Sequence, residues 1–256
     1  MSVSLTAHQF LLTPRLRGHI TFTYCFELTA MNASKLGAAI DHTLLQPAYL
    51  DHQITQLCQE ARHFAFATVC VFPSAVARAN SLLDGSTVKV CTVVGFPFGA
   101  TFGMVKAHEA REAIARGASE IDMVIDIAAL KNNRPDDVLI DIKEVVEVAY
   151  SLGASTKVII ETALLTDDEK KVACELITRA EADYVKTSTG FASHGATAAD
   201  VRLLRAHSGP SVRVKASGGI RTLDAALEMI EAGADRLGMS AGVAVMNEWN
   251  ARHSQA

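Results

Sequence analysis

Residues 120–161 read EIDMVIDIAALKNNRPDDVLIDIKEVVEVAYSLGASTKVIIE, and this stretch decides the fold class. It begins and ends with short apolar runs rich in Val and Ile, at residues 120–125 and 157–161. Between them, residues 135–152 carry apolar side chains at three- and four-residue spacing, and Gly153 follows as a helix-end signal. A strand, a helix and a second strand in this order predict a right-handed crossover between parallel strands.

The same alternation continues outward in both directions along the chain. Further strand candidates occupy residues 38–42, 68–72, 88–94, 183–187, 213–216 and 236–239. Eight such units in about 220 residues predict a single-domain α/β protein, a (β/α)8 TIM barrel. An open doubly wound sheet is the alternative, but the first strand leads into Asp41-His42-Thr43-Leu44-Leu45 without the glycine-rich turn such a sheet normally carries.

The first thirty residues stand apart from this series. They are rich in Ser, Thr and His and contain one acidic residue, Glu27. A secretory signal is disfavoured because polar residues interrupt the apolar run that begins at Leu5, whereas an acid-poor transit peptide and an early start codon stay open as alternatives. We predict an N-terminal extension over residues 1–30, disordered or not native, and one barrel domain over residues 31–256.

The composition excludes several classes of protein. The 256 residues are 49% hydrophobic, which excludes intrinsic disorder, and the net charge of −4 does not favour nucleic acid or an anionic membrane as partner. No apolar run reaches the roughly 18–20 residues that a membrane span needs. The five cysteines are scattered without a C-x-x-C pair, which argues against a disulfide scaffold or a structural zinc site. We therefore expect a cytoplasmic protein.

Two lysines in the predicted strands indicate catalysis. Lys186 and Lys215 end neighbouring strands, at the face of a barrel where active sites lie, and an unpaired ammonium buried there is very costly. A neighbouring cation and a dry site both lower the pKa of a lysine, and a free amine beside a carbonyl substrate forms a Schiff base. The imine is then an electron sink for making or breaking a C–C bond. The alternative is a structural ion pair of these lysines with Asp122.

Glycines after the last strands indicate an anion site. Gly218 and Gly219 follow the seventh strand, Gly238 and Ser240 end the eighth, and Gly190 follows the sixth. In barrels this region often forms a phosphate cradle from backbone N–H groups and a helix N-terminus. The alternative is that these glycines only make tight turns.

Metal chemistry is not indicated by the remaining residues. The nine histidines show no H-x-x-x-H spacing with a carboxylate on a shared helix, so we predict no metal and no cofactor. Cys70, at the end of the second strand, faces either the site or the core, where it would act as a small buried hydrophobe.

Six motifs together resemble the deoxyribose-phosphate aldolase family. They are IDHTLL (40–45), TVVGFPFG (92–99), EIDMV (120–124), VIIET (158–162), VKTSTGF (185–191) and VKASGGIRT (214–222). The resemblance covers about residues 35–245, and the last two motifs are the most specific. It implies a metal-independent class I aldolase on a TIM barrel. Such an enzyme cleaves 2-deoxy-D-ribose 5-phosphate reversibly into D-glyceraldehyde 3-phosphate and acetaldehyde, in deoxynucleoside catabolism.

The resemblance also implies roles for individual positions. Lys186 resembles the Schiff-base lysine, Lys215 the second lysine that keeps the first one unprotonated, and Asp122 the acid/base that moves protons with a water. The positions that line the sugar carbons are Asp41, Thr43, Cys70 and Thr189. The positions of the phosphate site are Gly190, Gly218, Gly219, Gly238 and Ser240.

Three departures from the family pattern affect these expectations. Phe191 stands where some members have a phosphate-holding lysine, so backbone N–H groups, Ser240 and Arg221 are expected to hold the phosphate. The C-terminal residues 249–256 contain no tyrosine, which some members use in proton transfer. Asp126 and Ala128 stand where many relatives have Asn and Gly, and the added carboxylate is expected to alter the local charge balance.

Other functions stay open at this point. One is a Schiff-base barrel of different specificity, such as a transaldolase-like transferase, and another is a non-catalytic barrel that binds phosphosugars. We expect a small phosphosugar as the partner, with no nucleic acid and no membrane. A homodimer is consistent with the fold because dimers are common among barrels.

Overall fold

A computed structural model describes residues 31–253 of the chain, and the predicted extension over residues 1–30 lies outside the described residues. The strands are β1 (Ile40–Leu44), β2 (Thr68–Val71), β3 (Lys89–Val94), β4 (Glu120–Val124), β5 (Ser155–Ile159), β6 (Tyr184–Lys186), β7 (Arg213–Ser217) and β8 (Arg236–Met239). They are parallel, follow one another in chain order and close into a barrel through the pairing of β8 with β1. The predicted (β/α)8 TIM barrel is confirmed, and the open doubly wound sheet is excluded.

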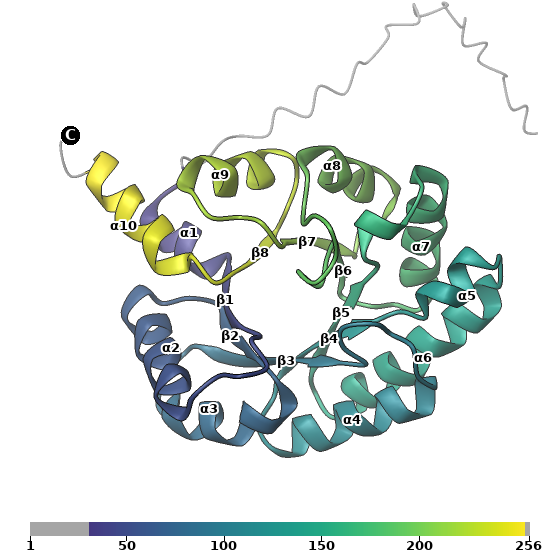
Figure 1. Cartoon of the computed structure of the whole chain (residues 1–256), viewed down its shortest axis with the longest axis horizontal. Helices are drawn as coiled ribbons and strands as arrows, with labels where there is room; N and C mark the ends of the chain where they lie inside the picture. Colours follow the sequence, from purple (N-terminus) through teal and green to yellow (C-terminus); the bar gives the residue numbers. More distant parts are fainter. Residues whose placement is uncertain (1–30, 254–256) are drawn as a thin grey trace, which may run out of the picture. The chain divides into compact units, whose positions relative to one another are not determined.

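Helices surround the ring of strands on its outer side (Figure 1). They are α1 (Ala33–Ala38), α2 (Asp51–Phe64), α3 (Val76–Leu82), α4 (Gly103–Ala115), α5 (Ile127–Lys131), α6 (Pro135–Ser151), α7 (Asp167–Arg179), α8 (Ala198–His207), α9 (Leu223–Glu231) and α10 (Gly242–His253). Two short 3-10 helices cover Pro73–Ala75 and Thr162–Leu164. None of the helices described is long and apolar enough to cross a membrane.

The local sequence explains where several of these helices begin and end. At the start of α7 the Glu169 amide donates to the Thr166 hydroxyl, while the Thr166 amide donates to the Glu169 carboxylate at 2.7 Å. This reciprocal pair is a capping box, which satisfies two amides that the helix itself leaves free. Gly153 follows the C-terminal end of α6. Its φ of 76° is a left-handed conformation that costs glycine little.

Two strands are displaced from their predicted positions by about two residues. The first begins at Ile40 instead of residue 38, because the preceding residues form α1. The fifth ends at Ile159 instead of residue 161, because Glu161 has a left-handed φ of 55° that strand backbone does not adopt. The strands of the two predicted lysines end within one residue of the predicted positions, with Lys186 as the last residue of β6 and Lys215 two residues before the end of β7.

The register of the parallel strands brings charged residues side by side inside the barrel. Alternate residues of a strand share a face, so Glu120 and Asp122 both point inward from β4. Asp122 is the register partner of Lys157 on β5, and Lys186 is the register partner of Lys215. The interior of this barrel therefore holds ion pairs in a place where most barrels hold branched apolar side chains.

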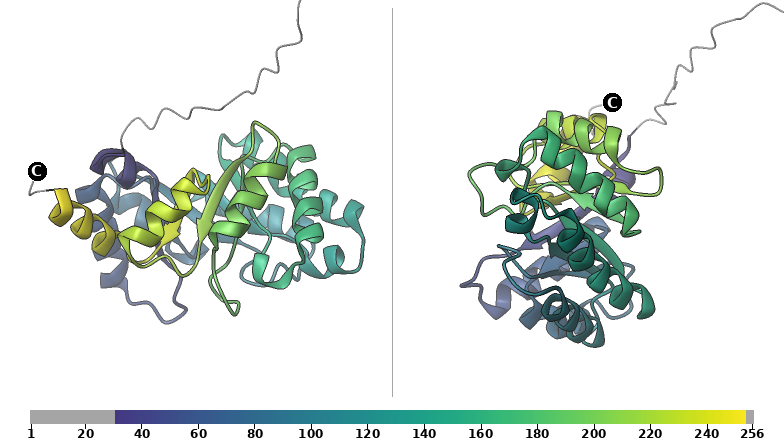
Figure 2. Two further views of the ribbon diagram at one scale, coloured as in Figure 1. Left: turned by 90° about the horizontal axis from the view of Figure 1, so that it is seen from above. Right: turned by 90° about the vertical axis from the view of Figure 1, so that its right-hand side faces the viewer.

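The connections after β1 and β6 project at the same end of the barrel (Figure 2). This is the end at which the strands terminate, and residues of both connections line one cavity. In α/β barrels the residues at this end carry the chemistry.

Candidate active site

A cavity of about 230 Å³ opens at the carboxyl ends of β1, β6, β7 and β8. Eight of the predicted site residues line it, namely Thr43, Lys186, Thr189, Gly190, Gly218, Gly219, Gly238 and Ser240. The other four, Asp41, Cys70, Asp122 and Lys215, are fully buried beneath it. The predicted set is therefore brought together in two layers. The eight lining residues form the rim of the cavity, and the four buried residues form its floor.

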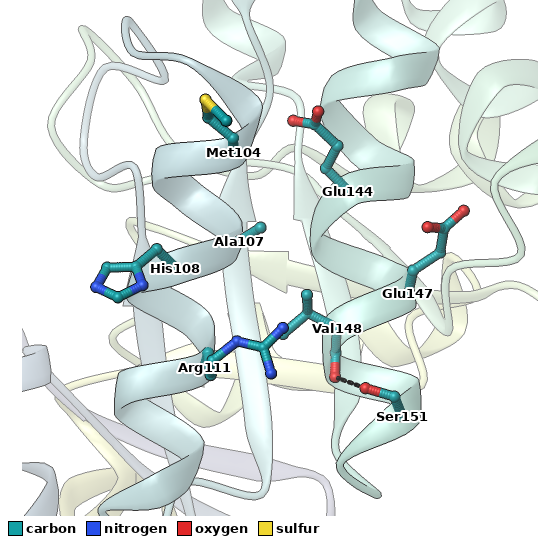
Figure 3. A pocket seen from close by; sticks show the side chains of 8 residues that line it. All are labelled: Met104, Ala107, His108, Arg111, Glu144, Glu147, Val148 and Ser151. Atoms are coloured by element: carbon teal, nitrogen blue, oxygen red, sulfur yellow. Dashed lines mark hydrogen bonds between the residues drawn. The ribbon is translucent and has the colours of Figure 1, made fainter.

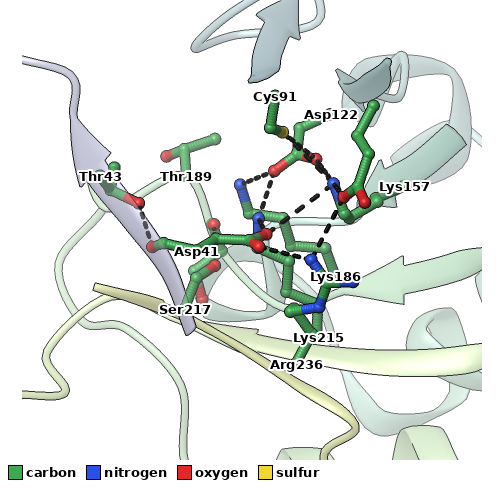
Figure 4. Close-up of polar contacts among 12 residues, drawn as sticks. Asp41, Thr43, Cys91, Asp122, Lys157, Lys186, Thr189, Lys215, Ser217 and Arg236 are labelled. Atoms are coloured by element: carbon green, nitrogen blue, oxygen red, sulfur yellow. Dashed lines mark hydrogen bonds and ion pairs between the residues drawn. The ribbon is translucent and has the colours of Figure 1, made fainter. Parts of the chain in front are cut away.

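The two predicted lysines meet at one carboxylate oxygen (Figure 4). Lys186 donates to Asp122 Oδ2 at 2.6 Å, and Lys215 donates to the same atom at 2.7 Å. Lys186 also borders the cavity, whereas Lys215 has no exposed surface. One amine is thus presented to the cavity while the second stays behind it.

Lys215 is held as a cation by two carboxylates. Its second acceptor is Asp41 Oδ2, at 2.5 Å. Burial alone would lower the pKa of Lys215, but the charges of Asp122 and Asp41 outweigh it and raise that pKa above its ordinary value. A positive charge therefore lies permanently next to Lys186.

The carboxylates of the floor remain ionised for the same reason. Burial would raise the pKa of Asp122, but the charges of Lys157 and Lys215 beside it hold it well below the usual range. The pKa of Asp41 is also lowered, because Lys215, Lys157 and Arg236 outweigh the effect of burial. Each carboxylate is therefore an acceptor of hydrogen bonds from the bases beside it.

A deeper layer of charge was not predicted. Lys157 donates to Asp122 Oδ1 at 2.8 Å and lies 2.7 Å from Glu120 Oε2. Arg236 donates to Asp41 Oδ1 at 2.6 Å and lies 3.3 Å from Glu120 Oε2. Glu120 and Arg236 are the first residues of β4 and β8, and Lys157 is the middle residue of β5. The two-residue spacing of Glu120 and Asp122 was the signal that a second charged layer lies beneath the first.

Metal-ligand atoms gather in two places in this interior. Cys70, Cys91 and Asp122 form one group, and Asp41, Cys91 and Glu120 form the other, with ligand atoms within 4.8 Å of one another. Every carboxylate in these groups is already paired with a lysine or with Arg236. In this structure the three carboxylates therefore compensate the charges of the lysines and of Arg236.

Glycine is required at two positions of the rim. Gly238 leaves room for Lys215, since a Cβ at this position would lie 3.0 Å from Lys215 Cε. Gly218 has a φ of 85°, and a Cβ there would lie 3.0 Å from Gly195 Cα. At both positions a side chain would collide with its neighbours, so glycine lets the chain segments of the rim approach closely.

The residues expected around a phosphate lie at the same rim. Ser240 is exposed and shortly precedes α10, and Arg221 also lines the cavity. Arg221 forms no ion pair with any residue that the structure describes. Phe191 is 49% exposed and packs edge-on against Phe96, with ring centroids 5.3 Å apart. The rim therefore offers a guanidinium group in place of a lysine at position 191.

The sugar-side residues are fixed by hydrogen bonds. Thr189 donates its hydroxyl to Glu161 and its amide to Glu161 Oε2 at 3.2 Å. The hydroxyl of Thr43 donates to the Asp41 carbonyl at 2.8 Å. Glu161, which ends the fifth predicted strand, thus anchors the loop after β6.

Cys70 and Asp126 do not border the cavity. Cys70 packs in a buried cluster with Cys91 and Val93 and does not border the cavity, as expected of a small buried hydrophobe. The Asp126 carboxylate accepts from the Ala129 amide at 2.9 Å and caps α5. Its added charge is thus directed at a helix N-terminus.

A second hollow lies on the outer side of the barrel, between α4 and α6 (Figure 3). Its volume is about 460 Å³, and its lining residues include His108, Arg111, Glu144 and Glu147. It contains none of the predicted site residues.

Comparison with known proteins places the chain in a family. The family described as DeoC/LacD family aldolase matches residues 35–248. The deoxyribose-phosphate aldolase of Lysinibacillus sphaericus (strain C3-41) is 56% identical over 208 residues, which is 81% of this chain and 93% of the relative. The enzyme of that name from Halalkalibacterium halodurans is 57% identical over 209 residues, with the same two coverages. The tetrameric deoxyribose phosphate aldolase of Aeropyrum pernix superposes with a TM-score of 0.81 at 33% identity, covering 86% of this chain and 93% of that one.

Proposed function

The chain belongs to the DeoC/LacD family of aldolases, and on this premise we propose that it is a deoxyribose-phosphate aldolase that works through a Schiff base on Lys186. The reaction is the reversible cleavage of 2-deoxy-D-ribose 5-phosphate into D-glyceraldehyde 3-phosphate and acetaldehyde. It belongs to deoxynucleoside catabolism and uses no metal. One observation carries the assignment of roles: Lys186 faces the cavity while sharing Asp122 Oδ2 with a buried lysine.

Formation of the Schiff base needs one free amine and a carrier of protons. Lys186 Nζ adds to the C1 aldehyde carbon of the open-chain sugar, and the aldehyde oxygen leaves as water. Asp122, together with a water, carries the protons that these steps release and consume. The permanent charge of Lys215 opposes a second positive charge on Lys186 and so favours the free amine.

Cleavage then uses the imine as an electron sink. Loss of the C3 hydroxyl proton breaks the C2–C3 bond, and the bonding electrons move into the protonated imine. D-glyceraldehyde 3-phosphate leaves, and an enamine remains on Lys186. Return of a proton to C2 and hydrolysis of the imine release acetaldehyde and restore the amine.

Residues around the cavity hold the rest of the substrate. Thr43 and Thr189 line the cavity beside the sugar carbons, and Asp41 and Cys70 support this side from the floor. The phosphate lies against the rim made by Gly190, Gly218, Gly219, Gly238 and Ser240. Arg221 supplies a charge for it, since its guanidinium has no counter-ion in the part of the chain described.

Borohydride trapping tests the assignment of Lys186. Wild-type protein reduced in the presence of acetaldehyde and a chelator should gain a two-carbon adduct, which peptide mass spectrometry should locate on Lys186. The Lys186→Ala variant should form no adduct and lose cleavage activity by a factor on the order of 10⁴ or more. An adduct or near-wild-type cleavage in that variant would show that the roles are wrongly assigned.

The same preparation separates this function from its alternatives. A transaldolase-like transferase would prefer a longer ketose donor over deoxyribose 5-phosphate in a donor screen. A binding protein would retain the sugar phosphate without turnover.

Replacement of Arg221 tests the phosphate site. We expect Arg221→Ala to lower kcat/KM for deoxyribose 5-phosphate roughly tenfold, because a charge-assisted hydrogen bond is lost. Cleavage of unphosphorylated deoxyribose by the same variant should be unchanged. An equal loss for both substrates would place Arg221 outside the phosphate site.

The remaining parts of the proposal concern domain, compartment and assembly. We expect residues 31–256 to suffice for activity, so a chain that starts at Met31 should fold and turn over as the full chain does. The protein is cytoplasmic and assembles as a homodimer. The exposed apolar side chains of Phe98, Phe102, Met104 and Val105 support self-association. Light scattering coupled to gel filtration should give the mass of a dimer in solution. Subcellular fractionation should place the protein in the cytoplasm.

A further inference from the structure

A column of largely buried charge adjoins Asp122 and Asp41, and two of its members, Lys157 and Arg236, are labelled in Figure 4. It consists of Arg236, Glu120 and Lys157. Glu120 contacts both of the others, while Arg236 contacts Asp41 and Lys157 contacts Asp122 on the floor of the site. Lys157 is fully buried and does not border the cavity, so it does not touch a substrate there. Its contacts nevertheless reach the proton carrier directly.

The two oxygens of Asp122 have separate partners. Oδ2 accepts from Lys186 and Lys215, as described above. Oδ1 accepts from Lys157 at 2.8 Å and from the Cys91 thiol at 3.1 Å. Because Oδ1 is held from below, rotation of the carboxylate away from the two strand-end lysines would break two further hydrogen bonds.

The charges of the cluster balance only if one base is neutral. Three carboxylates, those of Asp41, Glu120 and Asp122, face four basic groups, those of Lys157, Lys186, Lys215 and Arg236. Three of the four basic groups compensate the carboxylates, and a fourth charge in a dry interior would be unpaired and costly. Lys186 is the one that opens onto the cavity, where the reaction needs a free amine.

We propose that Lys157 is a positioning residue for the aldol reaction, an inference that rests on the function proposed above. It holds Asp122 through Oδ1 so that Oδ2 stays directed at the two strand-end lysines. Its charge completes the set of cations that balances the three carboxylates, and this keeps the amine of Lys186 free.

Each strand of the barrel contributes a charged or titratable group around Asp122, and the pH dependence arises from all of them. They are Asp41 on β1, Cys70 on β2, Cys91 on β3, Glu120 on β4, Lys157 on β5, Lys186 on β6, Lys215 on β7 and Arg236 on β8. Removal of the Lys157 charge leaves three basic groups facing three carboxylates, so the cluster then balances only when Lys186 is charged as well.

The test is the Lys157→Met variant in the full chain. We expect kcat at neutral pH to fall about tenfold to a hundredfold, with KM close to that of wild type, because the substrate contacts are intact. The acidic limb of the kcat/KM profile should move to higher pH. Borohydride should still trap acetaldehyde on Lys186.

Lys106 offers a matched control. It is also fully buried and donates to an aspartate, Asp141, at 2.7 Å. It belongs to α4, however, and its amine contacts α6 and the end of β4 outside the barrel interior. The Lys106→Met variant should lose stability while kcat of the folded enzyme and its acidic limb stay at wild-type values.

A charge-balanced double variant keeps the inference testable if Lys157→Met does not fold. Lys157→Met combined with Glu120→Gln removes one cation and one anion, so the acidic limb should return toward wild type while kcat stays low. Wild-type kcat in either variant overturns the proposal, and so does failure of both variants to fold, which would assign the column to stability alone. If wild-type protein itself neither cleaves deoxyribose 5-phosphate nor traps acetaldehyde, the proposed function fails instead.

Discussion

Lys186 and Lys106 are both buried lysines that donate to an aspartate. Lys186 donates to Asp122 at 2.6 Å, and Lys106 donates to Asp141 at 2.7 Å. Their surroundings differ. Asp122 is shared by three lysines, and one of these borders a cavity. Lys106 donates a second hydrogen bond to the Val124 carbonyl and does not border the cavity of the active site. A buried lysine thus indicates chemistry only when its amine remains accessible and its partner is shared.

The two aspartates respond in opposite directions to burial. Burial raises the pKa of Asp141, and the single charge of Lys106 only partly offsets it. Burial would raise the pKa of Asp122 as well, but the charges of Lys157 and Lys215 reverse the direction and hold it well below the usual range. One counter-ion therefore makes a structural pair, whereas several make a carboxylate that stays ionised in a dry interior.

The largest expected difference is between Lys215→Leu and Lys106→Leu. Loss of Lys215 removes the charge that keeps the neighbouring amine free, and we expect kcat/KM at pH 7 to fall by about 10²–10⁴. Loss of Lys106 leaves Asp141 without its counter-ion and should cost about 3–5 kcal/mol of stability with kcat of the folded enzyme unchanged. Steady-state kinetics and urea unfolding measure the two effects. Similar losses of kcat/KM in both variants would contradict the different roles assigned to Lys215 and Lys106.

The second comparison is the pH dependence of stability in Asp122→Asn and Asp141→Asn. Each variant breaks a buried ion pair and should be less stable than wild type by about 3–5 kcal/mol at pH 7. Because the folded pKa of Asp122 is lowered, its contribution is present above the unfolded pKa of about 3.9 and is lost as pH falls. The gap between wild type and Asp122→Asn should therefore narrow toward acid pH.

The raised pKa of Asp141 gives the opposite sign. A folded state that binds the proton more tightly than the unfolded chain gains stability as pH falls through the raised pKa. The gap between wild type and Asp141→Asn should widen in that interval. Urea unfolding at several pH values tests both slopes, and parallel curves for the two variants would contradict the assigned directions.

A smaller effect is expected for Gly238→Ala, which displaces Lys215 without removing it. The new Cβ would lie 2.9 Å from Ser217 Cβ and 3.0 Å from Lys215 Cε, so the lysine must shift. We expect kcat to fall about tenfold, since small misplacements of reacting groups are costly. Gly153→Ala is the control, because it strains a left-handed turn with nothing within 4 Å and should cost about 1 kcal/mol of stability only.

The smallest effect is expected for Asp126→Ala, beside the Lys106–Asp141 pair. The side chain caps α5, and its loss should cost about 1 kcal/mol of stability. The main-chain amide of residue 126, which donates to Asp141 at 2.9 Å, is retained. Wild-type kcat and pH profile should persist, and a shifted profile would show that this carboxylate does act on the active site.

Much of the fold follows from the sequence because its signals are local. The eight apolar runs, the capping box at Thr166 and the helix-ending Gly153 each depend on residues close together in the chain. The bounds of β1 and β5 were displaced because a short helix and a left-handed Glu161 compete with strand backbone there. Such competition is decided by tertiary contacts, so apolar patterns do not report it.

The site was only partly accessible from the sequence. Lys186 and Lys215 were predicted to meet because they end adjacent strands, and the register pairs them directly. Lys157 escaped prediction because its importance comes from register pairing with Asp122 across two separate strands. Alternation within a strand places residues on one of two faces but does not say which neighbour they meet or how deep they lie.

By itself the sequence determined the order of strands and helices, the two strand-end lysines, the glycine-rich rim and the family resemblance. The tertiary structure decided which of these lysines faces the cavity, how the oxygens of Asp122 are divided, and that Arg236, Glu120 and Lys157 form a charged layer beneath them. The physical reason is that burial and pairing act between strands far apart in the chain. In a dry interior the effect of a charge depends on how many partners closure of the barrel places around it.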